Sequence, residues 1–372
     1  MKRWLIVQAL PHWASAGFDR SSGRFEERLA FDGRQLVEAP IRLLVQARQI
    51  HVYALASRRH WSSDAPALVE RAFSSMLRDY HRQGNQDGWA FSIARDGTLV
   101  DGTRDLYAHA FVLLAVASYV DATGRLSALS VAEETLAFLD RSMRAPSGEG
   151  YVEGLPLKAT PRRQNPHMHL FEAMLALWEC SGDRAYLRRA DELYELFLRR
   201  FFRTQQGVVI EYFDDELRPA SGDFGAIVEP GHHYEWCWLL RRYEGARGSE
   251  SAGPLVERLY RHALQYGHDV EGFVVDELLS DGSTRTPSRR LWPVTEAIKC
   301  NIVEGLRNRP YCLERAAVLS DLLQHRFLAP ASAGTWIDRL DGESRPASDF
   351  APASSLYHLI GAIDELQRAA SD

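Results

Sequence analysis

The chain repeats a short pattern about every 60 residues. A glycine followed by an alternating aromatic or β-branched stretch recurs, and successive glycines are 65, 62, 57, 65 and 62 residues apart. The occurrences are GRFEE from Gly23, GWAFS from Gly88, GYVEG from Gly150, GVVIE from Gly207, GFVVD from Gly272 and GTWID from Gly334. Several run on into turns such as ARDGT and LSDGS, which is typical of short β-hairpins. A period of this length indicates a repeat architecture.

Helical patterns lie in pairs between these glycines, with apolar residues at helical spacing in each. The expected pairs are 40–57 with 64–82, 105–121 with 128–143, 165–181 with 184–201, 232–243 with 254–267, and 293–306 with 311–327. A last helix is expected over 354–369, and its partner is expected in the less regular N-terminal segment.

Polar residues in the first helix of each pair follow the same period. They are Arg48, His109, His169, His232, Glu296 and His358, separated by 61, 60, 63, 64 and 62 residues. Groups at equivalent positions would converge inside a closed ring, whereas an open solenoid would spread them along a surface. We therefore expect an all-α (α/α)6 barrel of six inner and six outer helices, with short β-hairpins in the connecting loops. No Pro-, Gly- or Ser-rich linker divides residues 1–372, so we expect a single domain.

Composition favours small-molecule chemistry. The net charge is -6 and the charged residues are interspersed, which gives no electrostatic footprint for nucleic acid. The four cysteines show no CxxC spacing. The sequence contains no run of about 18 apolar residues, the length that a membrane-spanning helix needs. The first residues begin like a signal peptide, but Gln8 and Pro11 interrupt the apolar run, so we expect a cytoplasmic protein. The lysines are Lys2, Lys158 and Lys299. Because lysines are so few, we do not expect Schiff-base chemistry.

Two histidines at the repeated position carry a glutamate three residues later, His169 with Glu172 and His232 with Glu235. A carboxylate that accepts from one ring nitrogen fixes the tautomer and leaves the other nitrogen free to move a proton. We therefore expect Glu235 to orient His232, and acid–base chemistry in a shared cavity. Metal binding is the alternative, since histidines near carboxylates are also a ligand set. Because no ligand-spaced histidine pair is evident, we expect no metal or cofactor.

The other histidines, among them His51 and His233, are expected to be ordinary core or surface residues. Aromatic residues near the hairpins and inner-helix starts could cover the faces of a sugar, or could equally pack in the core. They are Trp89, Tyr107, Trp236, Trp292 and Trp336.

These residues lie in motifs that resemble the N-acylglucosamine 2-epimerase superfamily, and within it the D-mannose isomerase and sulfoquinovose isomerase branch. The motifs are VQARQIHVYALA (45–56), DGW (87–89), DLYAHAF (105–111), NPHMHLFEA (165–173), PGHHYEWCWLL (230–240), LWPVTEA (291–297) and LYHLIGAI (356–363). The resemblance implies that His232 and His358 transfer protons, and that Arg48, Tyr107, Asn165 and His169 belong to the substrate pocket. Epimerase branches tend to read PGHxxEA, so Trp236 favours aldose–ketose isomerisation.

The expected function is thus a metal-independent isomerase of D-mannose and D-fructose, with D-lyxose and D-xylulose as a further pair, acting through a cis-enediol. His358 would move the proton between C2 and C1, His232 would open the ring and move oxygen protons, and Arg48 would stabilise the enediolate. The expected substrate-binding residues also include His109, Glu172, Glu296, Trp236 and Trp292. A monosaccharide is the expected partner, and the protein is expected to be a monomer or homodimer.

Three alternatives remain open. A 2-epimerase could use the same histidines on opposite faces of one intermediate. A glycoside hydrolase would use a pair of carboxylates, for which Glu172, Glu229, Glu235 and Glu296 are candidates. A non-catalytic sugar-binding protein would hold a monosaccharide without exchanging its C2 hydrogen.

Overall fold

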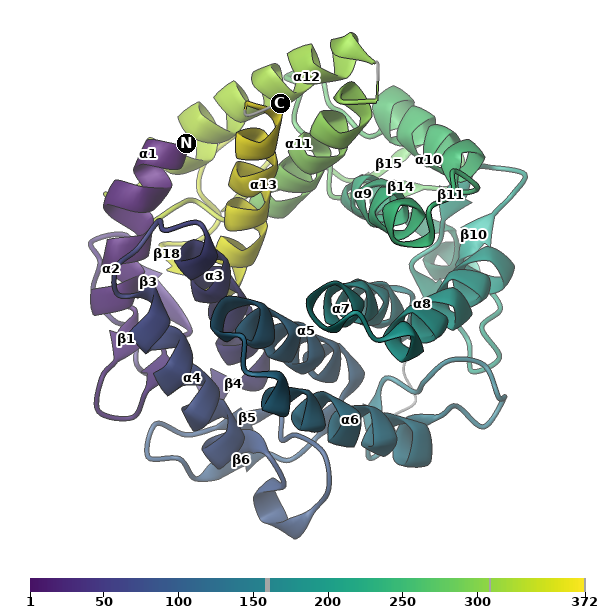
Figure 1. Ribbon diagram of the computed structural model, residues 1–372. Coiled ribbons are helices and arrows are strands. Elements are labelled where there is room, and N and C mark those ends of the chain that lie inside the picture. The colour runs from purple at the N-terminus through teal and green to yellow at the C-terminus, as the bar shows by residue number, and fades with distance from the viewer. Residues whose placement is uncertain (158–160, 308, 371–372) are drawn as a thin grey trace.

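A ring of parallel inner helices forms the centre of the molecule. The computed structural model describes residues 1–157, 161–307 and 309–370, so Lys158 lies outside the described residues. Within these ranges the inner ring has six helices, α3 (Leu43–Arg58), α5 (Leu106–Thr123), α7 (Asn165–Ser181), α9 (Pro230–Arg247), α11 (Leu291–Gly305) and α13 (Leu356–Ala369). Each packs on the next, and α13 packs on α3, so the ring closes (Figure 1).

The outer helices alternate with the inner ones along the chain and pack against them. They are α4 (Ala65–Tyr80), α6 (Leu129–Phe138), α8 (Arg184–Leu196), α10 (Gly253–Tyr266) and α12 (Pro310–Leu322). Short π-helical turns, η4 (Leu139–Met143), η5 (Phe197–Phe201) and η7 (Leu323–Leu328), extend α6, α8 and α12. The expected helix pairs and the all-α (α/α)6 barrel are therefore confirmed.

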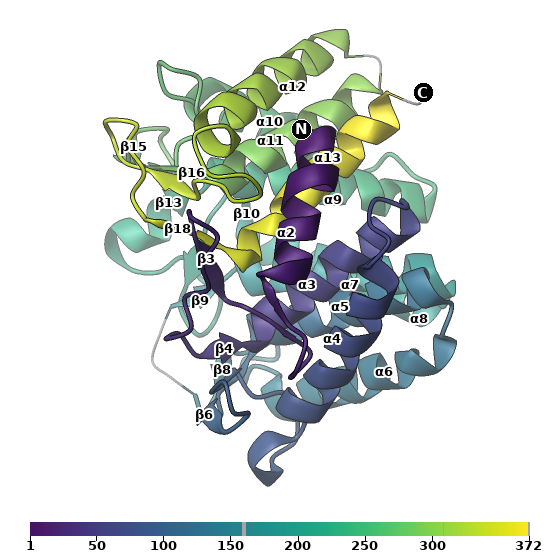
Figure 2. The ribbon, with the colours of Figure 1, turned by 90° about the vertical axis from the view of Figure 1, so that its left-hand side faces the viewer.

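The N-terminal segment supplies the remaining outer helix, beside α13 and α3 (Figures 1 and 2). It is helical through α1 (Lys2–Trp4), η1 (Leu5–Ala9) and α2 (Leu10–Ser15). The Tyr53 hydroxyl on α3 donates to the Leu10 carbonyl at 2.8 Å, and the Trp13 indole stacks on Trp336 from the last repeat. Trp336 is thus a core residue that joins the two ends of the chain.

Short antiparallel strands gather at one end of the helices (Figure 2). In successive repeats, a strand just before an inner helix pairs with a strand after the next repeat glycine. These pairs are β4 (Ile41–Arg42) with β5 (Ser92–Ile93), β7 (Arg104–Asp105) with β8 (Gly154–Leu155), β9 (Arg162–Arg163) with β12 (Tyr212–Phe213), β13 (Ile227–Val228) with β14 (Glu277–Leu279), and β16 (Arg289–Arg290) with β17 (Arg339–Leu340). β18 (Phe350–Pro352) pairs with β3 (Arg28–Ala30), so the strands also join the last repeat to the first.

Other strands complete these hairpins: β1 (Phe18–Asp19) with β2 (Arg24–Phe25), β10 (Phe202–Arg203) with β11 (Val208–Val209), β6 (Leu99–Asp101) on β5, and β15 (Thr284–Thr286) on β14. By length and hydropathy alone, α5 is the one helix of the described ranges that could cross a membrane. Because α5 belongs to the inner ring and 72% of that stretch is buried, packing inside the barrel accounts for its apolar surface.

Candidate active site

A cavity of about 380 Å³ lies at the N-terminal ends of the inner helices, on the side of the hairpins. We call it the front cavity. Expected site residues that line it are Arg48, Tyr107, Asn165, His169, His232, Glu235, Trp292 and His358. Tyr107, Asn165, His232, Trp292 and His358 come from the first turn of their helices, and the other three lie about one turn deeper. Its volume is within the range of small-molecule sites.

His232 is paired with a glutamate that the sequence reading missed. Its Nδ1 lies 2.9 Å from Oε1 of Glu211, in the hairpin before α9, and 3.9 Å from Glu229. Burial alone would lower the pKa of His232, but the charges of Glu211 and then Glu229 outweigh it and raise the pKa to about 9. His232 is therefore an imidazolium at neutral pH. The expectation that Glu235 orients His232 is wrong, because the carboxylate of Glu235 lies instead 3.9 Å from Nε2 of His169.

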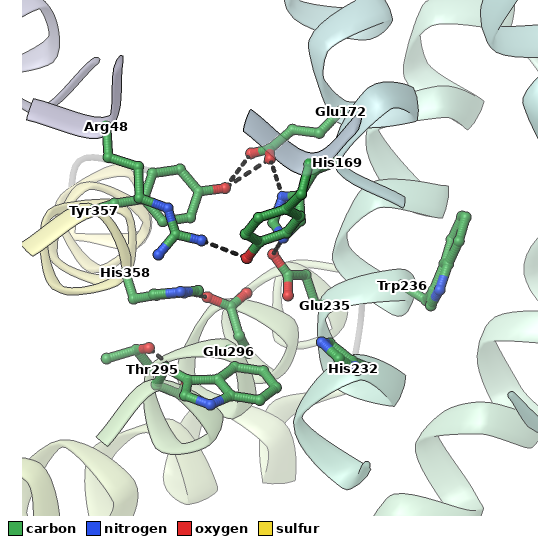
Figure 3. Close-up of polar contacts among 12 residues, drawn as sticks. Arg48, His169, Glu172, His232, Glu235, Trp236, Thr295, Glu296, Tyr357 and His358 are labelled. Carbon is green, nitrogen blue, oxygen red and sulfur yellow. Dashed lines mark hydrogen bonds and ion pairs between the residues drawn. The ribbon is translucent and has the colours of Figure 1, made fainter. Parts of the chain in front are cut away.

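Glu211 is held in turn by two buried residues. Gln164 Nε2 donates to Glu211 Oε2 at 3.0 Å, and the indole N–H of Trp236 donates to Gln164 Oε1 at 2.8 Å. Trp236 packs between Phe171 and Phe197, and Figure 3 shows it pointing away from the other labelled side chains. The expected contact of Trp236 with substrate is thus corrected: Trp236 acts on the site through Gln164 and Glu211.

A signal for Glu211 is present in the repeats. An acid recurs four residues after most repeat glycines, or three after Gly150. In other repeats this acid accepts from the backbone N–H and Nε of an arginine just before the next inner helix: Glu27 from Arg42, Glu153 from Arg163 and Asp276 from Arg290. Before α9 that arginine is replaced by Glu229, so Glu211 is left to pair with His232.

The charge state of His358 differs from that of His232. Its Nδ1 lies 2.8 Å from Oε1 of Glu296, which leaves Nε2 as the nitrogen available to the cavity (Figure 3). Burial, then the charges of Arg48 and Lys299, lower the pKa of His358 well below its ordinary value. His358 is therefore neutral where His232 is charged. Glu296 is fully buried behind His358, so it orients the imidazole and does not reach substrate as the sequence reading expected.

The indole of Trp292 lies between these histidines. Its ring centroid is 4.9 Å from that of His232 and 5.7 Å from that of His358. This position in the cavity wall agrees with the expectation that Trp292 binds substrate. Trp89 does not line the front cavity, because its buried indole donates to Thr135 in the core.

His169 and Glu172 form the expected i,i+3 pair, with Nδ1 and Oε2 3.0 Å apart. Glu172 also accepts from the Tyr357 hydroxyl, so its oxygens are engaged and it lies behind His169 instead of facing substrate. Both oxygens of Glu235 lack a hydrogen-bond partner among the described residues. Burial, then the neighbouring Glu296, raises the pKa of Glu235 well above its ordinary value, so this side chain can take part as a carboxylic acid.

Arg48 brings a fixed cation to the cavity. Its guanidinium donates to the Tyr107 hydroxyl at 2.7 Å and to the Ser354 carbonyl at 3.3 Å. It lies 4.2 Å from the ring centre of Phe111 and 4.9 Å from that of Tyr357, which holds the planar group in place. Arg48 is thus positioned to stabilise negative oxygen in the cavity.

His109 is not in the front cavity, contrary to expectation. Its Nδ1 contacts the Asp105 carbonyl at 2.7 Å, and its Nε2 accepts from the backbone N–H of Trp89 at 3.2 Å. Inner-helix residues in three other repeats also accept a backbone N–H of their hairpin: Gln46 from Phe25, His167 from Tyr151 and His233 from Val209. These side chains attach each hairpin to its inner helix, so His109 and His233 are structural residues.

Several clusters have the composition of a metal site. Glu211, Glu229 and His232 have ligand atoms within 4.8 Å of one another, as do Glu235, Glu296 and His358. Both of these clusters also contact a cationic side chain: Arg290 donates to Glu229 at 3.0 Å, and Lys299 Nζ lies 2.5 Å from Glu296. These cations offset part of the carboxylate charge, which weakens the electrostatic attraction for an added divalent cation.

The model of the N-acylglucosamine 2-epimerase family matches residues 23–362. The chain belongs to this family. A mannose-6-phosphate isomerase of Rhizobium meliloti is 36% identical over 98% of this chain and 95% of its own length. A D-mannose isomerase of Thermobifida fusca is 30% identical over 83% of each chain. The crystal structure of a D-mannose isomerase superposes with a TM-score of 0.84, at 20% identity over 98% of this chain and 96% of that one.

Membership of the N-acylglucosamine 2-epimerase family confirms the resemblance seen in the sequence. The family relatives include both sugar isomerases and sugar 2-epimerases, so the chain is a sugar isomerase or epimerase. The shared barrel explains why residues from every inner helix meet in one cavity.

Proposed function

We propose that the protein is an aldose–ketose isomerase that interconverts D-mannose and D-fructose. The observation that carries the proposal is the pairing of a charged His232 with a neutral His358 on either side of Trp292. A site that moves protons needs one group that gives a proton and one that takes it, and environments that push two pKa values apart supply both.

In the proposed reaction, Nε2 of His358 takes the C2 proton of the open-chain aldose. His232 gives its proton to O1, and the resulting cis-enediol loses the O2 proton to His232. His358 then returns its proton to C1, which leaves a 2-ketose and restores both histidines. Arg48 stabilises negative charge that develops on the oxygens. His232 also protonates the ring oxygen when the pyranose opens.

The charges of the front cavity favour an unphosphorylated sugar. Its arginines already have partners: Arg48 contacts Tyr107, Arg163 pairs with Glu153, and Arg290 pairs with Glu229 and Asp276. The carboxyl groups of Glu211, Glu229, Glu235 and Asp338 also line it. A phosphate monoester carries about -1.5 to -2 charges at pH 7 and would meet these acids. Among the described residues Arg48 is the lining guanidinium that is not paired with a carboxylate, and the proposed reaction assigns it to the oxygens of the reacting carbons. The substrate class therefore differs from the one in the name of the Rhizobium meliloti relative.

Proton NMR in deuterated water tests the proposal. Mannose should give fructose with deuterium at the exchanged carbon, and mannose 6-phosphate should react with a much lower kcat/KM. Failure to convert any unphosphorylated aldose would refute the isomerase. A preference for mannose 6-phosphate would refute the charge argument alone.

A 2-epimerase is the second candidate, because an imidazolium at His232 could instead return a proton to C2 from the opposite face. Cellobiose 2-epimerases are among the relatives, one of Bacteroides fragilis being 23% identical over 69% of this chain. Glucose appearing from mannose as fast as fructose, in the same NMR experiment, would favour this candidate.

A further inference from the structure

The barrel holds a second cavity, of about 420 Å³, at the C-terminal ends of the inner helices. We call it the rear cavity. Lys299 and Trp238 line it, together with Glu172 and Tyr357, which lie behind His169. The rear cavity has no role in the reaction proposed above, but Glu172 and Tyr357, which lie behind His169, form part of its wall.

Lys299 is buried at the inner end of this cavity. Its Nζ lies 2.5 Å from Oε2 of Glu296 and 3.8 Å from the ring centre of Trp238. The other oxygen of Glu296 lies 2.8 Å from Nδ1 of His358. An unbroken line of charged and polar contacts therefore runs from the rear cavity, through one carboxylate, to the imidazole in the front cavity.

We propose that Lys299 is a positioning residue for the isomerase proposed above, which keeps Glu296 ionised and so holds His358 with its proton on Nδ1 and a free base at Nε2. This inference rests on the proposed function for the role of His358. Lys299 itself does not touch the substrate, because it faces the rear cavity.

The physical reason is the proton count of the His358–Glu296 pair. With one proton, the pair is a carboxylate beside an Nδ1–H, and Nε2 can accept from C2. With a second proton, the pair is either an imidazolium beside a carboxylate, or a carboxylic acid that donates to Nδ1 of an Nε2–H tautomer. Nε2 is blocked in both arrangements. A buried carboxylate without a cation binds a proton at higher pH, so loss of Lys299 favours the blocked pair.

Other charges act on the same pair from the neighbouring helices. They are Arg48 on α3, His169 and Glu172 on α7, Glu235 on α9, and Tyr357 on α13. His51 on α3 acts on Lys299, and Arg242 on α9 and Glu365 on α13 line the rear cavity. The pKa of Lys299 is the balance of burial, which lowers it, and of the charges of Glu296, Glu235 and Glu172, which raise it above its ordinary value. Lys299 therefore stays charged, and it directly contacts Glu296.

The test compares the pH dependence of kcat/KM for wild type, Lys299→Met and Lys299→Gln. Removing the positive charge raises the proton affinity of the pair, so the acid limb should move to higher pH by about one unit or more. Lys299→Arg keeps the charge and should keep the acid limb near its wild-type position, whatever its effect on kcat. Arg58→Gln removes a cation that lines the same cavity and pairs with Asp121, and it should leave both activity and acid limb unchanged.

NMR titration of the His358 ring supplies a readout that does not need turnover. In Lys299→Met the pair should take up its proton at higher pH than in wild type. A folded Lys299→Met or Lys299→Gln with an unchanged acid limb and an unchanged titration would overturn the inference. If the wild type converts no sugar, the proposed function fails, while the titration still decides whether Lys299 controls the protonation of His358.

Discussion

The imidazole of His232 and the carboxylate of Glu211 lie 2.9 Å apart, although one belongs to an inner helix and the other to the hairpin before it. The hairpins therefore do more than close the mouth of the barrel. Glu211 sets the charge of His232 from outside the helix, and Gln164 holds the other oxygen of that carboxylate at 3.0 Å. Hairpin and helix together form the proposed general acid.

Glu211→Gln should lower the upper pKa of the activity profile. The carboxylate charge that raises the pKa of His232 is lost, while burial, which lowers it, remains. The base limb of kcat/KM should move down from about pH 9 by about one unit or more. Glu27→Gln is the matched control, because Glu27 is the equivalent acid of the first repeat and pairs with Arg42. It should lower the Tm and leave the pH profile in place.

Wild-type activity should show a broad plateau in pH. The acid limb reports His358, whose lowered pKa places it below pH 6.5, and the base limb reports His232 near pH 9. The free energy of unfolding should fall on the alkaline side. A histidine whose pKa is raised by folding contributes its full stabilisation at pH values below its pKa in the unfolded chain, and that contribution is lost as the pH rises through about 9. Initial rates and Tm values across pH 5 to 10 check both statements, and an activity optimum confined to acid pH would contradict them.

His358→Asn should abolish turnover without abolishing sugar binding. Loss of a general base costs about 100-fold to 10,000-fold in rate. Deuterium should not enter mannose or fructose, whereas calorimetry should still detect mannose binding. Persistent exchange of the C2 hydrogen in this variant would assign the base to another residue.

His233→Ala should keep its catalytic rate and lose stability. The Val209 N–H, which His233 accepts at 2.9 Å, would be left buried without that partner, at a cost of about 1–3 kcal/mol. His109→Ala should behave in the same way, because it would leave the backbone N–H of Trp89 without that acceptor. His232→Ala should instead lose most of its kcat, whatever its effect on stability. Denaturant unfolding and kcat measured on all three variants separate these roles.

Trp236→Phe should leave KM for mannose near the wild-type value, because the indole contacts Gln164 and not the cavity. The variant should shift the base limb in the same direction as Glu211→Gln, by a smaller amount, since Glu211 remains. A large rise in KM with an unchanged pH profile would place Trp236 against the sugar after all.

The fold could be predicted because the repeat is visible at several levels at once. Glycines, helical pairs and hairpin turns share one period, and each inner helix must bury most of its surface against its neighbours. Local pairs such as His169 with Glu172 were also predictable, since residues three apart on a helix face each other. The partner of His232 was not, because its contact depends on how the hairpin packs on the helix.

The error at His109 has a simple geometric cause. An equal spacing between repeats fixes a position only to within a residue or two, and each residue turns a helix by about 100°. Phe111, two residues on from His109, has its ring centre 4.6 Å from that of His169 and stacks on Arg48. Phe111 therefore occupies the inward position that the spacing assigned to His109.

Closure of the ring through β18 and β3 has a consequence for synthesis of the chain. The outer helix beside α13 is made before the rest of the barrel, and α13, with His358, is made after it. A nascent chain can pair its early repeats as they emerge, and its N-terminal helix can already pack on α3, but its contact with α13 must wait until that helix has been made. The proposed active site should therefore be completed when α13 docks, and a chain that stops short of residue 358 should stay an open arc without the proposed base.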